Sequence, residues 1–200
     1  MRKLVAGLCL CLSLFISSNI FAGPNTISVS QIKATDIITK GPWIDSRAYT
    51  TLEAANTAAY DAGKLLYITK NYTLIANTIL TAATRVEKGG GFTKASTYTL
   101  TINGPFDTGL YTVFTGFTSE DVLFGINSIK EMYPQWWGAK GDNITNDTVA
   151  FSAALKGMVT SKIKCFIPKG TYLLSQVIIG NASGDSAYIY IEGAGIENTV

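Results

Sequence analysis

Between Trp136 and Thr148 the sequence reads WWGAKGDNITNDT, and between Phe166 and Leu174 it reads FIPKGTYLL. Asp147 stands where a helix N-cap is expected, and apolar residues recur at helical spacing from Thr148 to about Val159. The Pro-Lys-Gly turn in the second run separates two short apolar segments. These patterns predict a helix, a strand, a tight turn and a second strand, in that order.

The rest of the chain is rich in short alternating apolar runs that end at turn residues. Many short strands at regular spacing are typical of an all-β fold. The predicted strands are residues 64–68, 72–75, 78–80, 98–102, 111–114, 163–167, 172–174, 177–179 and 188–192.

A second helix is expected over residues 51–62. Thr50 and Glu53 have the spacing of a capping box, and Gly63 suits the C-terminal end. The stretches that begin at Lys64 and Lys162 then resemble each other, because each reads as a strand, a lysine-containing turn and a strand after a helix. The two stretches begin about 98 residues apart, which is too far for one solenoid rung. We therefore interpret them as the related starts of two segments and not as a tandem array.

The two quoted runs resemble the opening of the rhamnogalacturonase/epimerase-like domain of the pectate lyase superfamily. Members read Gly-Ala-x-Gly-Asp-Gly-x-x-Asp-Asp-Thr, then a short helix, then a strand ending in Pro-x-Gly-x-Tyr. The resemblance covers Tyr133 to Val200, with Asn143, Asn146 and Ser152 departing from the usual Gly, Asp and Gln. It implies a right-handed parallel β-helix, a helix over its first end, and catalytic carboxylates on later rungs.

The N-terminus has the layout of a secretory signal peptide: Arg2 and Lys3, an apolar run of about 13 residues, and Ala22 before the cleavage position. The apolar run is too short to span a membrane, and no later stretch is suited to do so. We therefore expect a secreted protein with a signal peptide (residues 1–22), a strand-rich lead-in with one helix (23–132) and the start of a β-helix domain (133–200). We also expect this chain to be the N-terminal part of a longer protein.

Composition excludes several functions. The sequence contains no histidine, which rules out a Ser-His-Asp triad, a Cys-His pair and a His-ligated zinc site within these residues. Without Arg2 and Lys3 the mature chain has 14 basic and 14 acidic residues, so no nucleic-acid partner is favoured. Cys165, the one cysteine outside the signal, lies in an apolar run and is expected to be a buried hydrophobic residue rather than a reactive thiol.

Acidic residues offer the first candidates for chemistry. Asp142 and Asp147 suggest a carboxylate pair, but a turn and a helix cap explain them more simply. Glu120 and Asp121 are adjacent, would point to opposite faces of a strand, and are expected to be solvated.

Aromatic and glycine motifs are ambiguous as well. Trp136 and Trp137 would suit a sugar-stacking platform, although packing at the joint between the lead-in and the helix end is favoured. The glycine-rich runs at residues 89–91 and 193–195 lack the rest of a phosphate or dinucleotide motif and are interpreted as turns. The sequence therefore assigns no catalytic, substrate-binding or metal-ligating residue.

The leading functional hypothesis is action on an extracellular polysaccharide by hydrolysis, β-elimination or epimerisation, as the resemblance implies, with acidic polymers such as pectin or alginate among the candidates. A lyase of this kind would call for a divalent cation such as calcium, and no other cofactor is indicated. The alternative is a non-catalytic glycan-binding or adhesin-like β-helix, because one fold serves both roles. The sequence does not determine the oligomeric state.

Overall fold

The computed structural model describes residues 41–118, 121–177 and 188–195. The chain divides into two compact units, residues 1–37 and 38–200, and the described residues all belong to the second. The predicted signal peptide lies outside the described residues.

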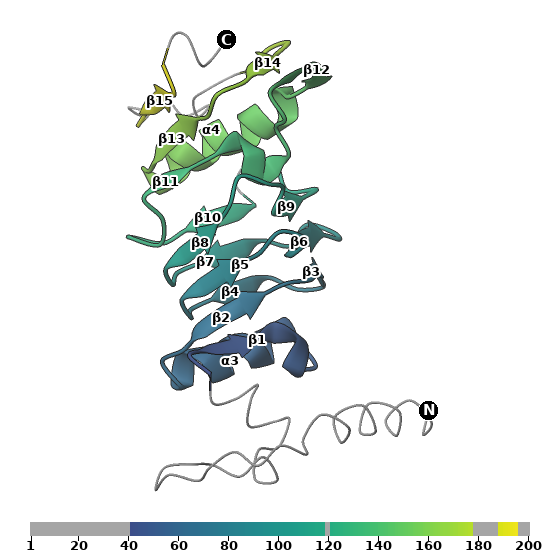
Figure 1. The fold of residues 1–200 in the computed structure, drawn as a ribbon, viewed down its shortest axis with the longest axis vertical. Helices are drawn as coiled ribbons and strands as arrows, with labels where there is room; N and C mark the ends of the chain where they lie inside the picture. The colour runs from purple at the N-terminus through teal and green to yellow at the C-terminus, as the bar shows by residue number, and fades with distance from the viewer. Residues whose placement is uncertain (1–40, 119–120, 178–187, 196–200) are drawn as a thin grey trace, which may run out of the picture. The chain divides into compact units, whose positions relative to one another are not determined.

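Residues 43–124 form parallel sheets in which each strand pairs with the corresponding strand of the next rung (Figure 1). Thr84 pairs with Phe106, Phe92 with Phe114, and Leu100 with Val122, so these rungs take 22 residues each. The first sheet contains β1 (Trp43–Asp45), β2 (Leu65–Ile68), β5 (Thr84–Val86) and β8 (Phe106–Thr108). The second contains β3 (Asn71–Leu74), β6 (Gly91–Lys94) and β9 (Phe114–Thr115), and the third contains β4 (Thr78–Leu80), β7 (Leu100–Ile102) and β10 (Val122–Phe124).

Parallel pairing continues into the C-terminal part of the described chain. β11 (Glu131–Met132) pairs with β13 (Lys164–Ile167), and β13 pairs in turn with β15 (Ile191–Gly193). Alongside them, β12 (Asp142–Asn146) pairs with β14 (Thr171–Leu173). The architecture is therefore a β-helix-like all-β fold with few helices, and it already begins in the segment expected to be a lead-in.

Inward-facing side chains stack in columns along the rungs. Leu80 and Ile102 are fully buried in one column, and Phe92 and Phe114 stack with ring centroids 6.1 Å apart in another. Fully burying one such side chain contributes about 1.5–3 kcal/mol relative to leaving it exposed. Because every rung repeats the contact, the apolar core is continuous along the stack.

Helix α3 (Leu52–Asp61) covers the first rung. Its buried residues include Leu52, Ala55 and Ala59. The N-cap is Thr51, whose hydroxyl accepts the Ala54 N–H, so the predicted capping box at Thr50 was one residue too early. Gly63 follows in the left-handed conformation (φ 61°), as expected for a helix end.

Asn56 of α3 is buried and joins the helix to the turn between β4 and β5. Its side-chain nitrogen donates to the Ile79 carbonyl and the Thr81 hydroxyl. Its side-chain oxygen accepts the backbone N–H groups of Thr81 and Ala82. One amide thus satisfies backbone groups that stacking leaves unpaired at the end of the fold.

The related starts predicted from the sequence are confirmed as structural repeats. Helix α4 (Thr148–Ser161) precedes β13 and β14 as α3 precedes β2 and β3. Leu66 and Cys165 occupy equivalent, fully buried positions, each in the second residue of its strand. Gly63 and Lys162, the left-handed residues after the two helices, also correspond.

The strand predictions near residues 111–114 and 177–179 were less accurate. The strand begins only at Phe114, and Tyr111 lies before it with its hydroxyl donating to the Val86 carbonyl. Val177 lies outside any strand, and residues 178–179 fall outside the described chain. Strands that the patterns missed are β1, β5, β6, β8, β10, β11 and β12.

We expect Asn56→Ala to lower the free energy of unfolding by about 3 kcal/mol, because it leaves two buried backbone donors without an acceptor. Urea denaturation monitored by circular dichroism measures this. Thr57→Ala, at the exposed neighbouring position of the same helix, is the control and should stay within about 0.5 kcal/mol of the parent. Equal stability of the two variants would contradict the role of Asn56.

Candidate functional site

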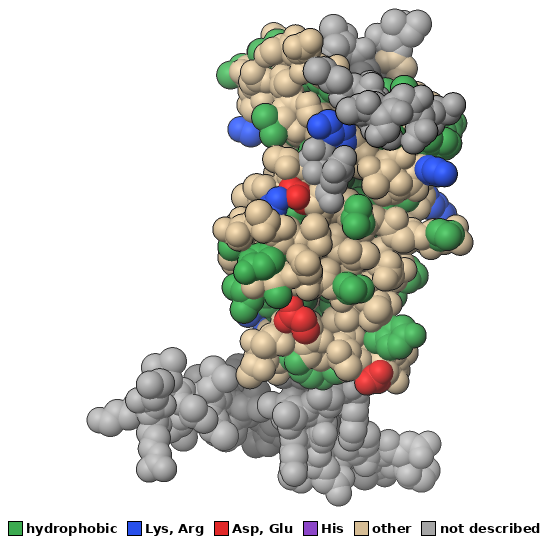
Figure 2. All heavy atoms as spheres, turned by 180° about the vertical axis from the view of Figure 1, so that it is seen from behind, with side chains coloured by type: hydrophobic (Ala, Val, Ile, Leu, Met, Phe, Trp, Pro, Cys, Tyr) green, Lys and Arg blue, Asp and Glu red, His purple; other side chains and the backbone are tan. Residues whose placement is uncertain are grey.

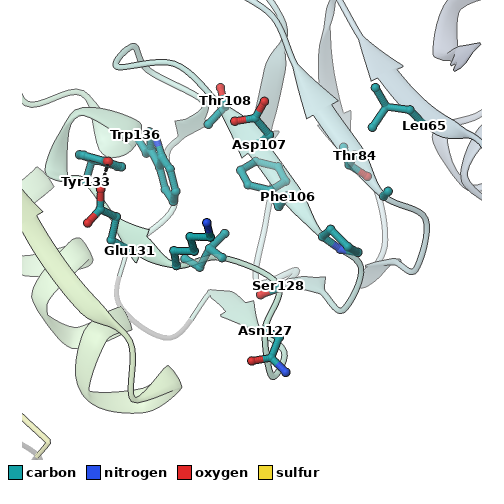
Figure 3. A pocket seen from close by; sticks show the side chains of 14 residues that line it. Leu65, Thr84, Phe106, Asp107, Thr108, Asn127, Ser128, Glu131, Tyr133 and Trp136 are labelled. Atoms are coloured by element: carbon teal, nitrogen blue, oxygen red, sulfur yellow. Dashed lines mark hydrogen bonds between the residues drawn. The ribbon is translucent and has the colours of Figure 1, made fainter. Parts of the chain in front are cut away.

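A cleft of about 490 Å³ runs across successive rungs on the side of the first sheet (Figure 3). Leu65 of β2, Thr84 of β5 and Phe106 of β8 line it at successive rungs, and Ser128 and Glu131 line it further along the chain. We call this cleft the groove. Because the groove crosses rungs, it runs along the stacking direction, so an extended ligand could lie in it.

The groove exists because the sheet changes partners after β8. The Phe106 N–H still donates to the Ser128 carbonyl at 2.7 Å, which continues the rung contact. The strand that follows, β11, pairs with β13 instead. The segment between, where Asn127 takes a left-handed conformation (φ 62°), forms part of the lining.

Charged side chains form a ladder on the outer face of these strands. Arg85 pairs with Asp107 of the next rung at 3.0 Å, and both are largely exposed. Further along, the Lys164 ammonium lies 2.8 Å from Glu131 and 2.9 Å from Glu192, which come from the strands on either side of β13. Each charge is therefore neutralised by a neighbour in the stack.

This pairing fixes the protonation states of the ladder. Hydrogen bonds from Lys164 and then Tyr133 lower the pKa of the Glu131 carboxyl. Hydrogen bonds to Glu131 and Glu192 raise the pKa of the Lys164 ammonium well above its usual range. Partial burial, and then the hydrogen bond it donates to Glu131, raise the pKa of Tyr133 to about 12. At neutral pH these groups are suited to polar recognition and poorly suited to proton transfer, which is fastest when the pKa is near the operating pH.

The two tryptophans pack as the favoured interpretation predicted. Trp136 is only 3% exposed, contacts Phe106 and Phe114 edge-on, and donates its ring N–H to the Gly109 carbonyl. Trp137 packs on Phe114 with ring centroids 5.1 Å apart. Both belong to the 3-10 helix η3 (Pro134–Trp137), which contacts α4, so they fill the joint. Only the buried Trp136 contributes to the groove lining.

Asp142 and Asp147 have separate structural roles. Asp142 is exposed and accepts the backbone N–H groups of Ile144 and Thr145, which lowers the pKa of its carboxyl. Asp147 is 1% exposed, and its two oxygens accept the N–H groups of Lys140 and Gly141. Asp147 does precede α4, but its side chain ties down the preceding loop instead of capping the helix.

Asp121 was expected to be solvated and is not. It lies 2.5 Å from the Lys94 ammonium and accepts the Thr118 N–H, with its side chain only 14% exposed. Glu120 lies outside the described residues. The predicted buried role of Cys165 is confirmed, because it is fully buried and burial raises its thiol pKa to about 12.

The glycine runs are structural. Gly91 begins β6, and a Cβ at Gly90 would lie 2.5 Å from the Ile68 carbonyl oxygen, so the turn stacks closely on the rung before it. Gly193 ends β15 and the Ala194 N–H donates to the Ile167 carbonyl. Within the described residues there is no cluster of three metal-ligating side chains and no helix long and apolar enough to cross a membrane.

The sequence patterns did not identify the charged ladder. Glu131 and Lys164 are 33 residues apart, and neither lies in a motif, so only the stacking register brings them together. Figure 2 shows charged side chains of both signs on the face seen from behind, including one basic and one acidic side chain in contact. Ion pairs are not confined to the groove lining, because Lys94 and Asp121, neither of which lines it, lie 2.5 Å apart.

Comparison with known proteins supports the resemblance seen in the sequence. Residues 136–200 match the family described as rhamnogalacturonase A/epimerase, pectate lyase-like. Searches of curated proteins and of solved structures gave no match. The family match covers α4 and strands β12 to β15, and it supports the similarity of this part of the chain to the pectate lyase superfamily.

The Glu131–Lys164 pair predicts how stability depends on pH. The lowered pKa of Glu131 means that its contribution is present above the unfolded-state value of about 4.5 and is lost as pH falls below it. The raised pKa of Lys164 means that its contribution is lost only at strongly alkaline pH. Glu131→Gln should therefore lower Tm by about 1–2 °C at pH 7 and by less at pH 3.

A double-mutant cycle is the control for this prediction. Lys164→Gln alone should lower Tm more than Glu131→Gln, because it also removes the contact with Glu192, and the double variant should lose less than the sum of the two single variants. Strict additivity, or an equal Tm loss at pH 3 and pH 7, would contradict the pairing.

Proposed function

We propose that this protein binds an extracellular polysaccharide along the groove. The observation that carries the proposal is that the groove crosses successive rungs, so that a chain of sugar units could contact each rung in turn. Pro105 offers an exposed apolar edge, while Asp107 and Asn127 offer exposed polar atoms. Such a mixture suits sugar rings, which have both apolar faces and hydroxyl edges.

We further propose that the rungs form a right-handed parallel β-helix. Two facts support this handedness. Connections between parallel strands of one sheet are right-handed in about 98% of cases. The family matched by residues 136–200 is pectate lyase-like. Export through the N-terminal signal peptide is the corresponding proposal for localisation, and it fits a polysaccharide ligand.

Chemical action on the polysaccharide is the second candidate function, and the family match favours it. Hydrolysis would need an acid and a second carboxylate at a set separation. β-Elimination would need a base near the sugar carboxylate, with a cation such as calcium to neutralise that carboxylate, and epimerisation would also need a group that removes a ring proton. Within the described residues, the carboxylates near the groove are ion-paired, which favours binding over catalysis in this part of the chain.

The groove proposal predicts that Asp107→Ala combined with Asn127→Gly weakens polysaccharide binding about tenfold, because two polar contacts are removed. Glycine at position 127 retains the positive φ that the backbone needs there. Isothermal titration calorimetry against neutral and uronate polymers measures the effect. Thr57→Ala, on α3 and outside the groove lining, should bind like the parent, and equal affinity of all three proteins would refute the groove as the site.

Incubating the protein with the same polymers separates the two candidate functions. New unsaturated ends would indicate elimination, new reducing ends alone would indicate hydrolysis, and a change in the C5 configuration of the uronate units without chain cleavage would indicate epimerisation. Binding without any of these products would favour the adhesin-like alternative.

A further inference from the structure

A second cleft, of about 740 Å³, lies at the C-terminal end of helix α4. Three lysines line it, Lys130, Lys162 and Lys164, together with the rings of Tyr188 and Tyr190. No aspartate or glutamate is among its lining residues within the described chain. We call it the basic cleft, since its lining carries ammonium groups and no carboxylate.

Two of the three ammonium groups are available for a ligand. Lys164 is held between Glu131 and Glu192, so its charge is already balanced. Lys130 and Lys162 are exposed, and neither forms an ion pair within residues 41–118, 121–177 and 188–195. The excess positive charge of the cleft therefore comes from these two side chains.

The backbone at Lys162 is unusual for a residue with a side chain. Lys162 has φ 56°, a left-handed conformation that is unfavourable for a non-glycine residue. The corresponding residue after α3 is Gly63, with φ 61°, which avoids that cost. Strained residues of this kind concentrate at functional sites, and Lys162 places its ammonium-bearing side chain on the cleft wall.

The basic cleft is continuous with the groove. Asn127, Ile129 and Lys130 line both. A polymer lying along the groove would therefore pass the two lysines as it leaves the β8–β11 step. The tyrosine rings beside them provide flat apolar surfaces against which a sugar ring could pack.

We propose that the basic cleft is an anion-binding subsite in which Lys130 and Lys162 hold an acidic group, a carboxylate or a sulfate, carried by the polysaccharide bound in the groove. The proposal rests on the proposed function and extends it, because it names the charge of the ligand and the residues that bind its acidic group. In this proposal, the contact between the Lys162 ammonium and the acidic group offsets the unfavourable backbone conformation at Lys162.

The test uses the whole chain and three polymers: neutral dextran, dextran sulfate and polygalacturonate. Lys162→Gln, which lies outside the groove lining, should weaken binding of the anionic polymers about threefold at low salt and leave dextran binding unchanged, and adding Lys130→Gln should extend the loss for the anionic polymers to about tenfold. Lys162→Gly should weaken the same binding about threefold while raising Tm by about 1–3 °C, since it relieves the left-handed strain. The matched control is Lys169→Gln, which removes an exposed lysine that lines neither cleft.

The outcomes are distinguishable. A preference for polygalacturonate over dextran sulfate would assign the acidic group as a carboxylate, and the reverse would assign it as a sulfate. If glycans bind and respond to the groove variants but not to the lysine variants, the anion subsite is refuted and the proposed function stands. If binding of the anionic polymers responds to the lysine variants while the groove variants change nothing, the subsite stands and the groove is refuted.

Discussion

Backbone pairing between successive parallel rungs is the interaction on which every other feature of this protein depends. In a stacked fold, the N–H and C=O groups of each strand are satisfied by the rungs before and after it, and inward side chains meet their equivalents one rung away. Phe92 against Phe114 and Leu80 against Ile102 are two instances. The same rule leaves the first rung without a strand partner on one side. There Asn56 of helix α3 accepts hydrogen bonds from the backbone N–H groups of Thr81 and Ala82 in the turn between β4 and β5.

The register that aligns the buried side chains of successive rungs also aligns their outward-facing side chains. Outward residues stack as regularly as inward ones, so Arg85 meets Asp107, and Lys164 meets both Glu131 and Glu192. The groove appears where this regularity is interrupted, between β8 and β11. Leu65, Thr84 and Phe106 line the groove at successive rungs, and a repeating polymer is the ligand that we propose for such a surface.

The sequence predicted best those features that depend on residues close together in the chain. Helix α4, the strands that follow it and the resemblance of residues 136–200 could all be predicted from short motifs. Strand β5, with only Thr84, Arg85 and Val86, was missed because three residues carry too little pattern, and stacking rather than propensity makes them a strand. The charged ladder was missed because its members are far apart in the chain. The role of Asp147 was only half predicted, since its burial depends on the loop at Lys140 that folds over it.

Disulfide trapping tests the in-register parallel stack most directly. In a Cys165→Ala background, cysteines at Arg85 and Asp107 would face each other across adjacent rungs, about 5 Å apart at Cα. The account predicts rapid disulfide formation under mild oxidation for this pair. A pair at Glu87 and Asp107, offset by two residues, should not close. Rapid closure of the offset pair, or failure of the in-register pair in a folded protein, would contradict the stack.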